Sequence, residues 1–281
     1  MAAPQARRYA DPMASRTATA PKTGVGPLLR EWRRRRRRSQ LELALDAGVS
    51  ARHISFLETG RSNPSRAMVI DLAANLELPL RDRNEMLIAA GYAPEYRELA
   101  YEDPDLGPVR AAIDQVLAAH DPYPALVVDR HWELITANRG MGLLTEGVAP
   151  HLLEPPANAL RLALHPEGLA PRMLNLGEWR RHILERLERH WRLGGDPALA
   201  ALLEELRDYP GEEVDEAAVA TAHDVFVPFR MRGPEGQELA FFGTIATFGT
   251  ALDVTVAELS IESFFPADDV TAAACRAHTP R

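Results

Sequence analysis

The stretch SQLELALDAGVSARHISFLETGRSNPS, residues 39–65, decides the fold of the N-terminal part of the chain. Its spacing of apolar residues predicts a short helix over residues 40–47. The apolar face of this helix is expected to consist of Leu41, Ala44 and Leu45. Gly48 follows, and because glycine supplies the backbone freedom that a sharp reversal needs, a turn is expected there.

A second helix is expected directly after the turn. Ser50 is placed to cap it, and Ile54 and Leu57 face back toward the first helix. The pair Asn63-Pro64 breaks the chain soon after its end. Two helices joined by a short, glycine-containing turn are typical of a DNA-reading helix-turn-helix. An ordinary αα-hairpin is the alternative.

Further helices are expected around this pair. One covers residues 26–37 and carries the unbroken basic run Arg33–Arg38, whose side chains would point all round a helix. Such a run is usually a solvated face, but six like charges repel one another, and a polyanion would relieve that repulsion. Two more helices are expected at residues 66–76 and 80–90. Residues 26–94 are therefore predicted to form an all-α domain of five helices.

The charge is distributed unevenly along the 281 residues, a length that suggests about two domains. Residues 1–70 hold 14 basic and 5 acidic side chains, a net charge of +9, and the remainder carries −17, which together give −8. A basic head on an acidic body indicates a nucleic-acid partner for one end only.

Composition predicts the boundaries of the remaining segments of the chain. Residues 1–25 lack periodicity and are expected to form a disordered arm, in which Arg7, Arg8 and Arg16 could add phosphate contacts. The remaining segments are a linker with a connecting helix at 95–120, a second domain at 121–266 and a C-terminal tail at 267–281.

Several classes of protein find no support in the sequence. The single cysteine, Cys275, excludes an intramolecular disulfide and fits a reducing cytoplasm. No apolar run approaches the roughly 20 residues of a membrane span. A glycine-rich phosphate loop, a nucleophile elbow and metal-ligand spacing among the histidines are all missing. We expect a cytoplasmic, nucleoid-associated protein that is not an enzyme, binds no metal and needs no cofactor.

The helix-turn-helix stretch resembles the Xre-type, phage-repressor-like regulators over roughly residues 26–92. The positions that carry the resemblance are Gln40, Leu41, Ala44, Gly48, Val49, Ser50, Ile54, Ser55, Leu57, Glu58, Gly60 and Pro64. It implies that Arg33 pairs with Glu58 of the recognition helix. It also implies that Gln40 bonds a phosphate and braces that helix.

The same resemblance implies which residues meet DNA. The full predicted set is Arg33, Gln40, Ser50, Ala51, Arg52, Ser55, Phe56, Arg61 and Asn63. Arg52 could give a bidentate contact to guanine, and Ala51 and Phe56 an apolar contact to a thymine methyl group. Arg61 and Asn63 match positions that usually touch backbone phosphate. Phe56 departs from the family pattern, in which a polar residue is common.

The second domain is predicted to be α+β. Two short strands are expected at residues 125–129 and 132–137, and Asn138 is expected to cap the next helix. The helices that follow are expected at residues 158–164, 176–193 and 197–206. Three longer strands are expected at residues 225–231, 238–246 and 255–264. This order makes an antiparallel sheet with helices on one side and leaves room for a small ligand, as in PAS-type sensor domains.

Two segments carry a second resemblance, YPALVVDRHWELITAN at residues 123–138 and NALRLALHP at residues 158–166. With the tryptophan-bearing helix and the terminal hairpin, they resemble the ligand-binding domain of MmyB-like transcription regulators over roughly residues 121–265. The resemblance implies a PAS-like fold and a bacterial regulator. Because at least some members of that family hold a fatty-acid-like ligand in an apolar cavity, the resemblance also implies such a ligand.

Such a ligand needs apolar walls and one polar or cationic partner for a carboxylate. The predicted walls are Leu126, Val128, Leu134, Leu160, Leu164, Trp179, Ile183, Phe242 and Ile245. Arg161 and His165 are the predicted partners of the head group, because they sit beside the apolar stripe of their helix. Plain core packing is the alternative for every wall residue.

The sequence thus predicts a DNA-binding transcription regulator that acts as a homodimer on a double-stranded operator and responds to a small apolar ligand. Two alternatives stay open. The second domain could grip a protein partner instead, or it could be an autoregulating enzyme that acts on a small apolar acid.

Overall fold

The computed structural model describes residues 24–211 and 227–279, which divide into two compact units. The N-terminal unit comprises residues 24–101 together with residues 249–257. The C-terminal unit comprises the other described residues, and each unit has its own hydrophobic core. Arg7, Arg8 and Arg16 of the predicted arm lie outside the described residues.

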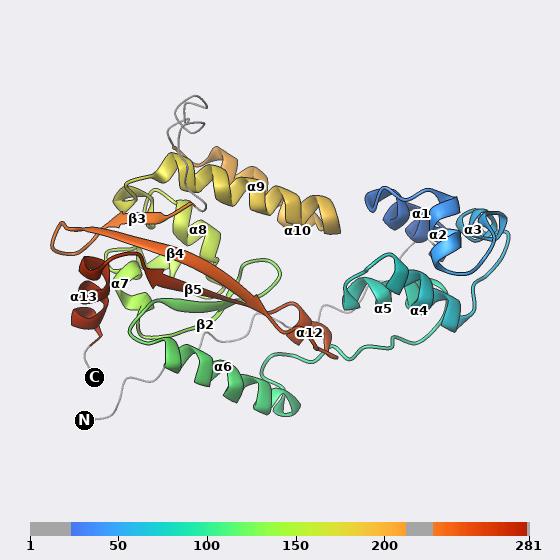
Figure 1. The fold of residues 1–281 in the computed structure, drawn as a ribbon, viewed down its shortest axis with the longest axis horizontal. Helices are drawn as coiled ribbons and strands as arrows, with labels where there is room; N and C mark the ends of the chain where they lie inside the picture. The colour runs from blue at the N-terminus through green and yellow to red at the C-terminus, as the bar shows by residue number, and fades with distance from the viewer. Residues whose placement is uncertain (1–23, 212–226, 280–281) are drawn as a thin grey trace. The chain divides into compact units, whose positions relative to one another are not determined.

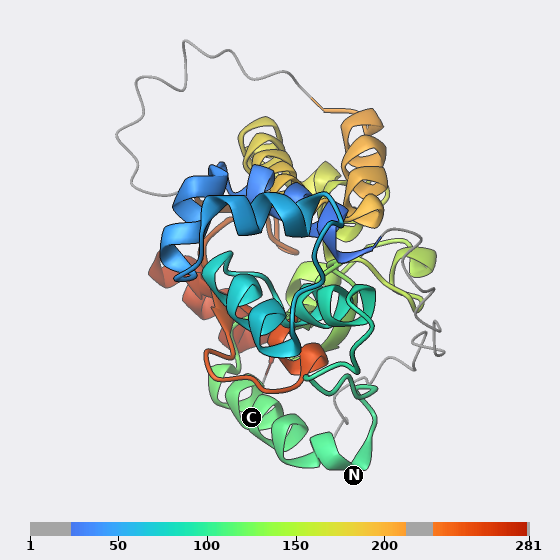
Figure 2. The same ribbon diagram turned by 90° about the vertical axis from the view of Figure 1, so that its right-hand side faces the viewer.

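The N-terminal unit is all-α, as predicted, and its first five helices run from blue to teal in Figures 1 and 2. Its helices are α1 (Val25–Arg35), α2 (Gln40–Asp46), α3 (Ala51–Glu58), α4 (Arg66–Asn75), α5 (Leu80–Ala89) and the short α12 (Val254–Ala257). The hydroxyls of Ser39, Ser50 and Ser65 accept backbone N–H bonds at the starts of α2, α3 and α4. These caps explain why the helices begin where the sequence places them.

Two glycines fix the path of the chain here. Gly48 has φ +63°, a left-handed conformation that makes the turn between α2 and α3. Gly26, in α1, lies against the end of α3, where an added Cβ would come within 2.5 Å of the carbonyl oxygen of Leu57. Helix α1 therefore contacts α3 directly.

The apolar face of α2 differs from the prediction. Leu43 and Ala44 are buried, whereas Leu41 is 59% and Leu45 71% exposed. Leucines at positions 41, 43 and 45 point in different directions on a helix of only seven residues. In so short a helix, periodicity does not identify the buried side.

The basic run Arg33–Arg38 makes more contacts within the fold than predicted. Helix α1 ends at Arg35, so the last arginines leave the helix and fold over neighbouring elements. The interactions are Arg33 with Glu58, Arg35 with Glu31, Arg36 with the carbonyl oxygens of Leu76 and Glu77, and Arg38 with Asp46. Arg34 and Arg37 are exposed. Internal partners, rather than a polyanion, offset much of the repulsion within the run.

Part of the predicted linker is folded. The buried side chain of Asn84 accepts the backbone N–H groups of Glu95 and Tyr96 at 2.9 and 3.0 Å and donates to the carbonyl oxygen of Tyr96 at 2.7 Å. Residues 95–101 therefore belong to the N-terminal unit, because one amide satisfies three of their backbone groups.

The C-terminal unit contains a five-stranded antiparallel sheet in the order β2-β1-β5-β4-β3. The strands are β1 (Ala125–Val128), β2 (Leu134–Ala137), β3 (Phe229–Arg232), β4 (Glu238–Thr247) and β5 (Ser260–Pro266). The helices are α6 (Gly107–His120), α7 (Met141–Thr145), α8 (Ala159–Leu164), α9 (Leu176–Gly194), α10 (Pro197–Asp208) and α13 (Asp269–His278). Short 3-10 turns lie at Pro104–Leu106, Pro150–Leu152 and Ala170–Arg172. This is the predicted α+β, PAS-like arrangement (Figure 1).

Two of the predicted strands begin later than expected. Residues 254–257 form α12 rather than the start of β5, because Asp253 accepts the N–H of Val256 at 3.2 Å and starts a helical turn. The β-branched residues there had suggested a strand. Strand β3 begins at Phe229, and Val225 and Phe226 lie outside the described residues.

The end of the chain and Asn138 also differ from the prediction. The expected tail forms α13, capped by Asp268, and its buried Cys275 packs in the core, where burial raises the pKa of the thiol to about 11. Asn138 caps no helix. Its Oδ1 accepts the N–H of Ala125 at 2.9 Å and its Nδ2 donates to the carbonyl oxygen of Tyr123 at 2.7 Å, which ties the end of β2 to the start of β1.

Candidate functional site

One buried carboxylate joins three helices of the N-terminal unit. Arg33 on α1 donates from Nε and Nη2 to the two oxygens of Glu58 at 2.6 and 3.0 Å. Gln40 on α2 donates to Oε2 of the same carboxylate at 2.8 Å. The Glu58 side chain is only 2% exposed. The predicted Arg33–Glu58 pair is thus confirmed, and Arg33 acts inside the fold rather than at its surface.

The ionisation of this cluster follows from its contacts. Burial by itself raises the pKa of Glu58, but the hydrogen bonds from Arg33 and Gln40, with the nearby arginine charges, bring that pKa below its usual value. The hydrogen bond to Glu58 raises the pKa of Arg33. Both groups are therefore charged at neutral pH, and α3 is fixed to α1 and α2 by an ion pair.

The outward side of α3 carries the remaining residues of the predicted DNA-binding set. Arg52, Arg61 and Asn63 are exposed, whereas Ala51, Ser55 and Phe56 are partly buried. The Ser50 hydroxyl accepts the N–H of His53 at 3.1 Å, so it is already engaged as the cap of α3. The structure places these residues at the N-cap of α3, on α3 itself and in the segment that follows it.

Two arginines lie close to the Phe56 ring, and sequence reasoning did not identify these contacts. The guanidinium carbon of Arg52 lies 5.2 Å from the centre of the Phe56 ring, and that of Arg61 lies 5.9 Å from it. At these distances the ring attracts both cations. Phe56 therefore orients the two exposed arginines, which accounts for an aromatic residue at a position that is commonly polar.

Most of the predicted ligand walls lie together in the core of the C-terminal unit. Leu126 and Val128 on β1, Leu160 and Leu164 on α8, and Trp179 and Ile183 on α9 are buried in one cluster, with Leu134 packed against it. The strand, the short helix and the long helix thus share one core, as either a ligand wall or plain core packing requires.

Two predicted wall residues lie elsewhere. Phe242 stacks on Phe265, with ring centroids 5.1 Å apart, while its neighbour Phe241 is fully buried in the core. Successive strand residues point to opposite faces, so the choice of Phe242 was wrong by one position. Ile245 is 44% exposed because it lies beyond the packed part of the sheet.

The predicted head-group partners are engaged with other side chains. Arg161 donates from Nε and Nη2 to the two oxygens of Glu205, both at 2.7 Å, and Tyr209 donates to Glu205 at 2.6 Å. Burial and the neighbouring Glu205 raise the pKa of Tyr209 to about 12. The ring of His165 packs edge-on against Tyr209. These contacts join α8 to α10, so Arg161 is paired with Glu205 and His165 packs on Tyr209, whereas both were predicted to bind the head group of a ligand.

A different polar group lies between the sheet and α9. Glu262 on β5 is buried, and Arg186 on α9 donates to it at 3.3 Å. The guanidinium carbon of Arg186 lies 4.3 Å from the centre of the buried Trp132 ring. Burial raises the pKa of Glu262, and the charge of Arg186 opposes this effect. Motif spacing does not reveal this group, because its members are 54 or more positions apart along the chain.

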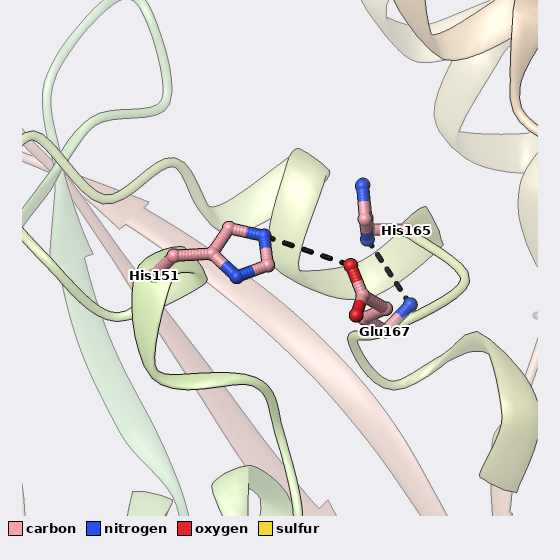
Figure 3. Close-up of side chains that lie close together, drawn as sticks. All are labelled: His151, His165 and Glu167. Carbon is pink, nitrogen blue, oxygen red and sulfur yellow. Dashed lines mark hydrogen bonds and ion pairs between the residues drawn. The ribbon is translucent and has the colours of Figure 1, made fainter.

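Another cluster lies on the surface of the C-terminal unit (Figure 3). The side chains of His151, His165 and Glu167 offer ligand atoms within 4.8 Å of one another, and histidine and carboxylate are zinc ligands. The backbone N–H of Glu167 donates to Nδ1 of His165 at 3.0 Å, so this nitrogen is already in use. His151 and Glu167 are mostly exposed. The geometry alone assigns no metal to this cluster.

Comparison with known proteins agrees with the two-part architecture. A family model described as "MmyB-like transcription regulator ligand binding domain" matches residues 109–277, and one described as "Helix-turn-helix" matches residues 29–82. No curated protein matched the chain. A solved chain titled "Structure of an RNA-binding Light-Oxygen-Voltage Receptor" aligns at 13% identity and a TM-score of 0.27, over 90% of this chain and 62% of its own length. A TM-score this low says nothing about fold or function.

The two matches define a DNA-binding transcription regulator with a ligand-binding domain. The first match covers more than half of the chain. The chain therefore belongs to the family of MmyB-like transcription regulators, and both resemblances seen in the sequence are confirmed. No helix among the described residues is long and apolar enough to cross a membrane.

Proposed function

We propose that the protein binds a double-stranded operator as a homodimer, and that a small, apolar, fatty-acid-like ligand in its C-terminal unit changes its affinity for that operator. One observation carries the regulatory part of this proposal. The connection between β4 and β5, residues 249–257, folds as part of the N-terminal unit. Two strands of the ligand-binding sheet thus continue directly into the DNA-reading unit.

The contacts of this connection are specific. The N–H of Val254 donates to the carbonyl oxygen of Arg97 at 2.8 Å, and the Thr255 hydroxyl donates to that of Leu99 at 2.6 Å. The carboxylate of Asp253 accepts the N–H of Leu99 at 3.2 Å. Val254 is fully buried. Because buried backbone groups are satisfied here, the connection is bound firmly to residues 97–99.

A ligand can act through this connection only if it binds unequally to two states of the protein. Displacement of the ends of β4 and β5 would strain or relax the contacts of α12 (Val254–Ala257) with residues 97–99. Coupling of this kind is typically worth about 1–3 kcal/mol, which is roughly 5- to 150-fold in operator affinity.

The dimer follows from how helix-turn-helix proteins read DNA. A single α3 of eight residues contacts only a few base pairs, and two copies on half-sites about 34 Å apart give a longer, specific operator. The exposed pair Arg52 and Arg61 supplies the cationic surface that each half-site needs.

The experiment begins with an operator selected from random duplexes. Its affinity for the full chain is measured by fluorescence anisotropy, with and without decanoate, and native mass spectrometry gives the number of chains bound. Two chains per operator and at least a fivefold effect of decanoate are expected. One chain per operator would contradict the dimer.

A variant tests the route of coupling. Asp253→Ala should keep the affinity of the ligand-free protein for the operator within about twofold, because Asp253 does not lie on α3, and should reduce the effect of decanoate to below about twofold. Asp269→Ala, an exposed change on α13, serves as the matched control and should respond fully. A full response in Asp253→Ala would show that the β4–β5 connection does not transmit the signal.

A further inference from the structure

Strand β4 has a free edge along its second half. Residues 238–241 pair with β3, whereas residues 242–247 pair with β5 on one side and, among the strands that the structure describes, with none on the other. The reason is length, because β3 has four residues and β4 has ten, so β4 continues past the end of β3 (Figure 1). Such an edge presents a row of backbone N–H and C=O groups to which another strand can bind.

The register of the sheet identifies the groups that face this edge. The backbone groups of successive residues in an antiparallel strand point alternately to its two sides. Those of Ala240 point to the β5 side, because its carbonyl oxygen accepts the N–H of Ala267 at 2.8 Å. Gly243, Ile245 and Thr247 therefore direct their N–H and C=O groups away from β5. Three donors and three acceptors thus lie along the free edge.

The free edge is exposed and uncharged. Residues 243–247 are all exposed, and at their centre Ile245 presents a large apolar side chain that is 44% exposed. The 14 consecutive residues 239–252 include no charged side chain, although 26% of the residues of the chain are charged. Charged side chains and prolines are the usual means by which a protein keeps an edge strand from pairing. Residues 242–247 contain neither, which favours their use as an interface.

The chemistry of this edge fits a second copy of the chain. Residues 71–281 carry a net charge of −17, so two copies approach each other most easily where the surface is neutral. In a two-fold pair each surface meets its own copy. With the axis at Ile245, Gly243 lies opposite the partner's Thr247, and the three donors of each copy meet the three acceptors of the other. Six backbone hydrogen bonds form, and the two exposed isoleucines cover each other.

We propose that two copies of the chain pair through this edge, with residues 243–247 of one protomer antiparallel to the same residues of its partner and Ile245 opposite the partner's Ile245. The two five-stranded sheets then form one continuous sheet. This inference rests on the proposed function, because it names the interface of the homodimer proposed there. It places the dimer contact directly before residues 249–257, which fold with the N-terminal unit.

The first test is sedimentation velocity of the full chain without DNA, over a series of protein concentrations. The N–H of Thr247 faces the free edge, so Thr247→Pro removes one donor from each copy and puts a ring in the path of the incoming strand, but keeps the ladder to β5. The dissociation constant of the dimer should rise at least about tenfold. Thr247→Ala keeps the N–H and is the matched control, which should stay within about twofold.

An exchange of charges tests the register without a proline. Ile245→Lys and Ile245→Glu each place like charges directly opposite one another, so each variant alone should dimerise at least about tenfold more weakly. In an equimolar mixture a lysine faces a glutamate, and a heterodimer should form with an affinity near that of the unmodified protein. A register centred on another residue would not give this rescue.

Hydrogen exchange resolved to single amides gives an independent readout. As the protein concentration rises, the amides of Gly243, Ile245 and Thr247 should exchange at least about tenfold more slowly, because the partner strand accepts their hydrogen bonds. The amides of Thr244 and Ala246 face β5 and should not change.

Three results would overturn the inference: a chain that stays monomeric, a dimer that Thr247→Pro leaves unchanged, or a mixture of the charge variants that does not associate. Protection of the three amides in a dilute monomer would also overturn it, since another part of the same chain would then cover the edge.

Native mass spectrometry of the operator complex separates this failure from that of the proposed function. If two chains bind each operator while Thr247→Pro dimerises like the unmodified protein, the homodimer stands and this interface falls. If the edge variants abolish a dimer in solution but one chain binds each operator, the interface stands and the proposed operator complex falls.

Discussion

The carboxylate of Glu58 allows the strongest test of how the DNA-reading unit is held together. Glu58→Gln keeps the shape of the side chain but removes its charge and turns one acceptor into a donor. That donor would face Arg33 or Gln40, which now donate to both oxygens at 2.6–3.0 Å. A buried ion pair that loses one partner typically costs 3–5 kcal/mol, and because Arg33 also donates to the carbonyl oxygen of Arg38, we expect about 3 kcal/mol.

Hydrogen exchange by mass spectrometry on the full chain measures this loss within α1–α5 alone. A cost of about 3 kcal/mol corresponds to roughly 100-fold faster exchange of the most protected amides in these helices. Glu31→Gln is the matched control, since Glu31 pairs with Arg35 on the surface of α1 and should cost less than about 1 kcal/mol. Equal effects of the two changes would refute the argument that the Arg33–Glu58 pair braces the unit.

The same pair predicts a pH dependence with a definite sign. The pKa of Glu58 is lower in the folded protein than its usual value. The ionised carboxylate therefore stabilises the fold fully at pH values above the usual pKa, and this stabilisation is lost as the pH falls through the folded pKa. The acid limb of unfolding should therefore be less steep in Glu58→Gln. If the acid limb were as steep in Glu58→Gln as in the unmodified protein, the group that titrates would be a different one.

Two further predictions concern the outward side of α3. Arg52→Ala should cost about 1–3 kcal/mol of operator affinity and relax selectivity at one base position, measured by selection from random duplexes; full affinity and selectivity would refute the proposed docking. Phe56→Leu should free Arg52 and Arg61 from the ring and weaken operator binding several-fold without a change in its salt dependence, because the number of charges is the same, and Phe56→Tyr should restore it; equal affinities of the Leu and Tyr variants would contradict a positioning role.

The features that the sequence predicted well are local. Ser50 caps α3 through an N–H three residues away, and Gly48 makes its turn through its own φ angle, so a few neighbouring residues determine both. The Arg33–Glu58 pair spans 25 positions, and it was predicted from a family pattern rather than from any local rule. The order of strands and helices along the second domain was also predictable, because each strand carries its own apolar pattern.

The features that it predicted poorly depend on which face of an element is covered. Phe241 and Phe242 are equivalent in sequence, and only the register of β4 with β5 makes Phe241 the buried one. The sequence predicted that Arg161 would bind a ligand, but in the fold Arg161 donates to Glu205, which is 44 positions away along the chain. Neither choice can be made from composition or spacing, because each depends on a partner that is distant along the chain.

Strands β4 and β5 lead from the sheet of the C-terminal unit into the segment that folds with the N-terminal unit. Strand β4 ends at Thr247, two residues after Ile245, and β5 begins at Ser260, two residues before Glu262. The segment between these strand ends contains residues 249–257, which fold with the DNA-reading unit. A displacement of the paired residues Ile245 and Glu262 would therefore act four residues before Gly249 and five residues after Ala257. A ligand deep among the buried aromatic residues of the core would have to displace close-packed side chains before α12 could move, and such packing resists small displacements. Under the proposed function, the end of the sheet at Thr247 and Ser260 is thus the part of the C-terminal unit from which a displacement would reach α12 most directly.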